Sequence, residues 1–92
     1  MNDQSTPVKQ YATLVNLGLA WQKVSQALRR LERAEEATEA MGKAAAAFQE
    51  AIELAPGPED SAQAYFLLGL AHRDLDHLDE AEVAFRRALE LE

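Results

Sequence analysis

Cysteine is absent from the 92-residue sequence, so neither a disulfide bond nor a reactive thiol can contribute to stability or chemistry. Long apolar runs are missing as well, since none approaches the roughly 18 residues of a membrane-spanning helix. The first residues, MNDQSTPVKQ, lack the apolar core of a signal peptide. We therefore expect a cytoplasmic protein with no membrane partner.

Basic residues are few, with 9 Lys and Arg against 16 Asp and Glu and a net charge of −7. A surface this acidic repels a phosphate backbone, so we expect no nucleic-acid partner. Catalytic groupings are missing too. Ser25 and Ser61 have no histidine and acid in a recognisable arrangement, and no glycine-rich loop is present to bind phosphate. We expect neither enzymatic activity nor a cofactor.

Glycine and proline are rare, with 4 and 3 residues, and alanine, leucine and glutamate dominate the long runs. This composition favours an all-α fold. Pro56 and Pro58 end one helix and begin the next. Gly42 is the only breaker between residues 31 and 44, so an unbroken helix to residue 55 is the alternative to a turn near residues 32–34. We predict four helices, after disordered residues 1–5, at about 7–32, 34–55, 58–75 and 78–91.

The segment 62–92 places small and large apolar residues at the spacing of a packed helix pair. Gly69 leaves room for a partner helix to approach, and Phe85 fills the gap. The pattern consists of Tyr65, Leu68, Gly69, His72, Ala81, Phe85 and Ala88. It resembles the tetratricopeptide repeat, W-x2-L-G-x2-Y…A-x3-F, with Tyr65 and His72 at the usual Trp and Tyr positions. The resemblance implies stacked antiparallel helical hairpins and a binding function.

The same pattern fits the first half of the chain in two placements, offset by seven residues in each helix. The outer placement uses Leu14, Leu17, Gly18, Trp21, Ala44, Phe48 and Ala51. The inner placement uses Trp21, Val24, Ser25, Leu28, Ala37, Met41 and Ala44, and departs from the pattern at Ser25 and Met41. Both describe one hairpin over residues 7–55 with arms about two turns longer than usual. A standard unit at 58–92 completes a single helical-repeat domain.

The resemblance also implies a peptide groove lined by the first helix of each pair. The matching positions are Ala12, Val15, Leu19, Gln22, Gln63, Phe66, Leu70 and Arg73. They lack the Lys, Asn and Arg set with which some members bind chaperone C-termini, so that activity is not implied. We expect a scaffold, adaptor or chaperone-type module that binds a peptide or helix. The alternative is a structural assembly domain whose apolar surface is buried by its own copy.

Large apolar residues on the first predicted helix alternate at spacings of three and four, as in a coiled coil. This seam consists of Leu14, Leu17, Trp21, Val24, Leu28 and Leu31. The second hairpin is shorter and covers only part of the first, so we expect an exposed tip. The tip residues are Val24, Leu28, Leu31 and Met41, and we predict a homodimer through them.

His72 and Asp76 are four residues apart on a predicted helix, with His77 adjacent, a spacing compatible with two metal ligands. Zinc requires three or four converging ligands, and no second cluster is present in the sequence. His72 also occupies the aromatic position of the repeat pattern. We therefore expect a packed histidine between helices and no metal site.

Overall fold

The computed structural model describes residues 6–92, so the prediction of disorder at residues 1–5 lies outside it. Four helices follow one another in that range: α1 (Thr6–Arg30), α2 (Ala34–Leu54), α3 (Pro58–Asp74) and α4 (Leu78–Glu90). No strand occurs among the described residues. The all-α prediction is confirmed, and each helix end lies within two residues of its predicted position.

Both hairpin turns use the same backbone hydrogen bonds. In the first turn the amide of Arg33 donates to the carbonyl of Leu28 at 2.9 Å, and Glu32 has a φ of 61°. In the second turn the amide of His77 donates to the carbonyl of His72 at 2.8 Å, and Asp76 has a φ of 64°. This bond closes a helix C-terminus through a residue in the left-handed region. The first turn lies at residues 31–33, which excludes the unbroken helix.

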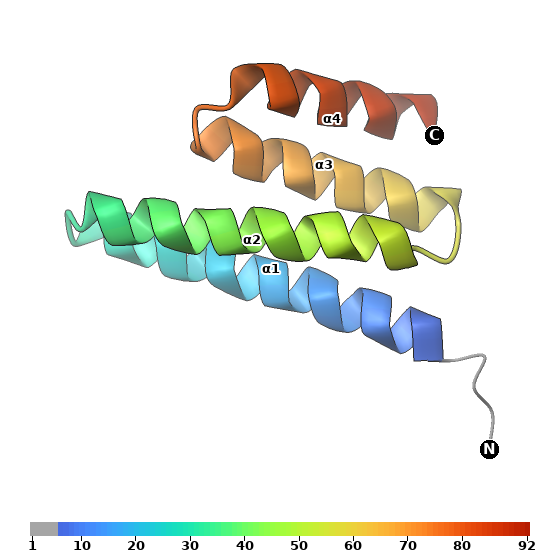
Figure 1. The fold of residues 1–92 in the computed structure, drawn as a ribbon, viewed down its shortest axis with the longest axis horizontal. Helices are drawn as coiled ribbons and strands as arrows, with labels where there is room; N and C mark the ends of the chain where they lie inside the picture. Colours follow the sequence, from blue (N-terminus) through green and yellow to red (C-terminus); the bar gives the residue numbers. More distant parts are fainter. Residues whose placement is uncertain (1–5) are drawn as a thin grey trace.

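The helices lie side by side in a single layer (Figure 1), and the Cα atoms span 46 × 31 × 13 Å. α2 packs against α1 on one side and α3 on the other, and α4 packs against α3. The first hairpin has helices of 25 and 21 residues, whereas the second has 17 and 13. The end of the first hairpin with the α1–α2 turn therefore projects beyond the second (Figure 1).

A phenylalanine ring packs over a glycine in each hairpin. A Cβ atom added to Gly69 would lie 2.5 Å from Cε1 of Phe85, and one added to Gly18 would overlap the ring of Phe48. Only glycine permits these approaches, because any side chain would force the two helices apart. The outer placement of the repeat pattern on the first hairpin is thus the one that aligns with the second hairpin.

The inner placement is used as well, with serine at the glycine position. Ser25 is completely buried, and its hydroxyl donates to the carbonyl of Ala37 at 2.7 Å. A buried hydroxyl is tolerated because this bond satisfies it. Tyr11 makes the corresponding link to the second hairpin. Its hydroxyl lies 2.8 Å from both the carbonyl oxygen of Asp60 and Oε1 of Gln63, and it can donate a hydrogen bond to either.

The two types of glycine give a matched test of the packing. In Gly18→Ala the new methyl group meets the Phe48 ring, so we expect a loss of about 1–3 kcal/mol in the free energy of unfolding. Nothing lies within 4 Å of the Cβ position at Gly42, so Gly42→Ala should stabilise the helix by about 0.5–1 kcal/mol. Urea denaturation followed by circular dichroism measures both changes. Equal effects at the two sites would contradict the proposed packing.

Candidate functional site

A groove with a volume of about 810 Å³ lies between α3 and α4 on the side away from the first hairpin. Its floor is apolar. The rings of Phe66 and Phe85 pack with centroids 5.7 Å apart, and Phe66 remains 49% exposed. Leu70 comes from α3 and Leu89 from α4, where Leu89 is 70% exposed. The full lining consists of Glu59, Ala62, Gln63, Phe66, Leu70, Arg73, Phe85, Ala88, Leu89, Leu91 and Glu92.

Charged residues lie at the two ends of this groove. α3 and α4 are antiparallel, so Glu59 at the start of α3 and Glu92 after the end of α4 line the same end. Arg73, in the last turn of α3, lies at the other end. It is exposed, and its Nε lies 3.7 Å from Asp74, a distance at which the pairing contributes little. The groove therefore has an acidic end and a basic end.

The predicted groove residues divide between two environments. Gln63, Phe66, Leu70 and Arg73, all from α3, line the groove together. The residues from α1 do not reach it. Val15 is buried with Ala51 and Ala64, and Leu19 is half-buried against both core clusters. Gln22 is half-buried and Ala12 exposed on α1.

Residues of α4 complete the groove in place of those from α1. Phe85 and Ala88 belong to the repeat pattern as packing residues, whereas Leu89 and Leu91 lie outside the pattern, and all four line the groove. Leu89 follows Phe85 by four residues and so lies on the same side of α4. Extending the Phe85 stripe along the sequence is the signal that identifies it.

The predicted dimer residues are also divided. Met41 is 1% exposed and belongs to the core with Leu68 and Ala71, so its assignment to an exposed tip is wrong. The reason is that α3 extends far enough along α2 to cover it, with Leu75 packed against the same cluster. Val24 and Leu31 are exposed, and Leu28 is half-buried.

The exposed part of the α1 seam extends well beyond the tip. Leu17 is 47% exposed, in the middle of the helix, and Leu14 and Trp21 are half-buried at the edge of α2. The ammonium of Lys43 lies 4.6 Å from the centre of the Trp21 ring, within the range of a cation–π interaction.

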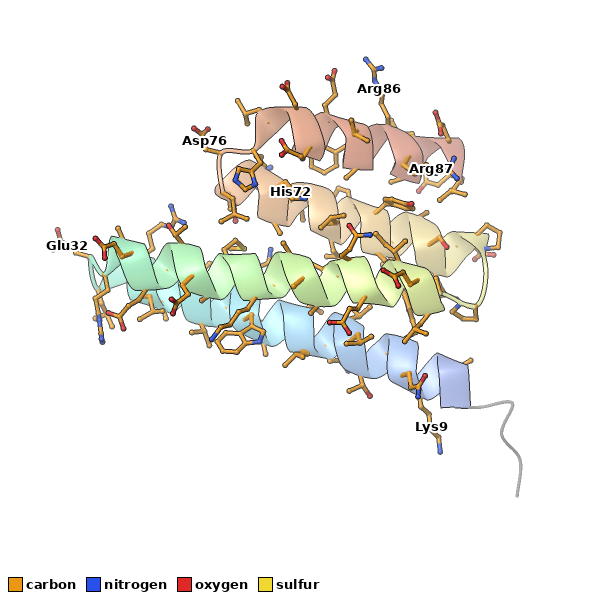
Figure 2. All side chains as sticks on the ribbon, in the orientation of Figure 1. Lys9, Glu32, His72, Asp76, Arg86 and Arg87 are labelled. Atoms are coloured by element: carbon orange, nitrogen blue, oxygen red, sulfur yellow. The ribbon has the colours of Figure 1, made fainter. Side chains whose placement is uncertain are left out.

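His72 lies near the second turn, where it packs beside His77 and the start of α4 (Figure 2). The Nδ1 atoms of the two histidines are 3.3 Å apart. Burial lowers the pKa of His72, proximity to His77 lowers it further, and Glu80 opposes the shift. Among residues 6–92, no group of three or more His, Asp or Glu side chains is arranged to hold a metal ion.

The paired hairpins define the chain as a helical-repeat protein. Residues 62–92 match the family model of the tetratricopeptide repeat, and no curated protein and no solved structure gives a significant match. The match covers about a third of the chain, residues 62–92, which are therefore similar to a tetratricopeptide repeat, and the four-helix architecture agrees with paired hairpins of that kind. Repeats of this family are generally non-enzymatic modules that bind proteins or peptides. No helix in the described part of the chain is both long and apolar enough to cross a membrane.

The histidine pair predicts a loss of stability in acid. The folded state depresses the pKa of His72, so protonation favours the unfolded chain, whose histidine has a pKa of about 6.5. The stability that neutral His72 contributes is present above that pH and is lost as the pH falls through the lower, folded-state pKa. His72→Tyr should reduce the fall in thermal midpoint between about pH 7 and 5. Parallel pH profiles for the variant and the parent would rule out this contribution.

Proposed function

We propose that the α3–α4 groove binds an apolar face of a partner protein's α-helix, which makes the chain an interaction module of scaffold, adaptor or chaperone type. The observation that carries the proposal is the apolar floor of Phe66, Leu70, Phe85 and Leu89, partly exposed along one continuous groove. An exposed apolar patch with polar residues at its rim is typical of a protein interface.

A helical partner is favoured over an extended one by packing within the chain. α3 lies against the first hairpin and buries Ala64, Leu68 and Ala71 there. The α3–α4 groove repeats the glycine and phenylalanine packing of that hairpin at Gly69 and Phe85. A surface of this shape accommodates the ridges of another helix.

The charges at the ends of the groove favour one direction for the bound helix. A helix N-terminus carries partial positive charge and its C-terminus partial negative charge. The N-terminus is therefore stabilised beside Glu59 and Glu92, and the C-terminus beside Arg73. The bound helix runs parallel to α3, with basic side chains in its first turns.

The alternative function is a structural assembly domain whose apolar surface is buried by its own copy, and the predicted dimer contact lies on α1 and α2. Val24 and Leu31 lie on the first hairpin, whereas the groove is formed by α3 and α4. A dimer contact through these residues can coexist with a helix of a different protein in the groove, whereas a copy of the chain bound in the groove itself would exclude that partner.

Leu70→Asp tests the groove directly. A display library of amphipathic helical peptides is selected on the intact chain, and the affinity of a selected peptide is then measured for both proteins. A charge in the middle of the apolar floor should weaken binding by about 30-fold or more, as loss of an interface hot spot does. Val83→Asp is the matched control, because Val83 is an exposed apolar residue of α4 outside the groove.

Circular dichroism establishes whether the Leu70→Asp protein is folded, since Leu70 is half-buried. If it unfolds, Leu89→Asp replaces it, because Leu89 is largely exposed and its substitution places little demand on the core. Unchanged affinity in a folded groove variant would refute the proposed function.

A further inference from the structure

α1 presents an apolar surface to solvent on the side away from α2 and α3. Its central residues are Leu17 and Val24, 47% and 43% exposed, separated by the small exposed residue Ala20. Thr13 precedes them at the same spacing and is also exposed. We name Thr13, Leu17, Ala20 and Val24 the α1 docking face.

This face has an equivalent on α3. Aligning Gly18 with Gly69, the glycines under the two phenylalanine rings, aligns the whole of α1 with α3. The α1 docking face then corresponds to Ala64, Leu68, Ala71 and Leu75. The first three of these α3 residues are buried, and Leu75 is half-buried, where α3 docks on the first hairpin. α1 thus exposes to solvent the surface that is equivalent to the one with which α3 docks on the first hairpin.

The surface that receives α3 also has an equivalent. Aligning Phe48 with Phe85 aligns Ala44 with Ala81 and Ile52 with Leu89. Phe48 and Ile52 belong to the cluster that Leu68 of α3 packs into, and Phe85 and Leu89 line the α3–α4 groove. α1, at one edge of the layer, therefore carries a docking face, and the α3–α4 hairpin at the other side of the layer carries the groove that matches it.

The two edges carry opposite charge. α1 contains no acid and four basic residues, Lys9, Lys23, Arg29 and Arg30. Residues 58–92 contain nine acids and three arginines. Complementary fields of this kind guide two surfaces together and disfavour contact between like edges.

We infer that the chain associates head to tail with copies of itself, with the α1 docking face of one copy bound in the α3–α4 groove of the next. The inference rests on the proposed function of the groove and names its occupant. In this arrangement α1 of one copy lies parallel to α3 of the next copy, just as α1 and α3 are parallel to each other within one chain. Lys9 projects from the start of α1 away from α2 (Figure 2). The proposed contact places it beside Glu59 and Glu92, at the acidic end of the neighbouring copy's groove.

A two-fold dimer through α1 is the competing arrangement. It would place the four basic residues of one α1 beside the same four of the other, with no acid on either helix. Head-to-tail contact instead joins surfaces of opposite charge, and an open chain of copies has one free docking face at one end and one free groove at the other. Such a contact forms a ring or an open chain of copies.

The oligomeric state of the intact chain tests the inference, with sedimentation velocity measured over a range of concentrations. We expect masses that rise with concentration past twice the 10.2 kDa of the monomer. Leu17→Asp disables the docking face and Leu89→Asp disables the groove, so each variant alone should be a monomer. An equimolar mixture should form a dimer and stop there, because each variant retains the surface that the other lacks. Val83→Asp, outside both surfaces, should assemble like the parent.

A charge exchange separates docking from folding. Lys9→Glu should weaken assembly, and the same substitution combined with Glu59→Lys should restore it. A change in stability alone gives no such rescue. Circular dichroism confirms that each variant is folded before it is compared.

Other results would overturn the inference. If Leu89→Asp still dimerises and Leu17→Asp does not, the contact is the two-fold one through α1. A parent that stays monomeric at every concentration excludes self-association altogether. In that case the peptide measurement on Leu70→Asp still stands on its own. Loss of peptide binding there retains the groove with a different partner, and unchanged binding means that the proposed function fails as well.

Discussion

The contact between a phenylalanine ring and a glycine determines how closely the helices of each hairpin approach. Gly18 and Phe48 make it in the first hairpin, and Gly69 and Phe85 in the second. Helices this close leave room mainly for alanine between them, which is why the core is alanine-rich and its largest completely buried side chain is Phe48. Repeating one contact in two hairpins also gives their edges the same shape, so that stacking follows from it.

The local pattern predicted most of the fold. The spacing of Gly69 and Phe85, the prolines around Gly57 and the offset second placement are properties of short segments, and they predicted four helices and the turn after α1. The sequence alone showed that Ser25 occupies a glycine position, as a departure from the repeat pattern. The burial of its hydroxyl and the hydrogen bond to the carbonyl of Ala37 could be seen only in the structure.

The candidate site was predicted only in part, because a repeat pattern fixes a residue's position within its unit and not what lies beside that unit. Val15 and Phe66 occupy equivalent positions, yet Val15 is covered by α3 and Phe66 faces an open groove. Leu17 and Leu68 are likewise equivalent and have opposite exposure. Met41 was misplaced for the same reason, since its burial depends on how far α3 overlaps α2.

The single-layer arrangement has a consequence for motion. α2 and α3 each pack against a helix on both sides, whereas α4 packs mainly against α3, and α1 packs mainly against α2 with a smaller contact to α3 at Tyr11 and Val15. In a structure stabilised by nearest-neighbour contacts, an edge element can detach while the remainder stays folded. α4 is the shortest helix and lies at an edge, so we expect it to open locally more readily than the longer helices. Opening of α4 removes one wall of the groove, and the lifetime of any bound helix is therefore coupled to the fraying of the helix that helps to hold it.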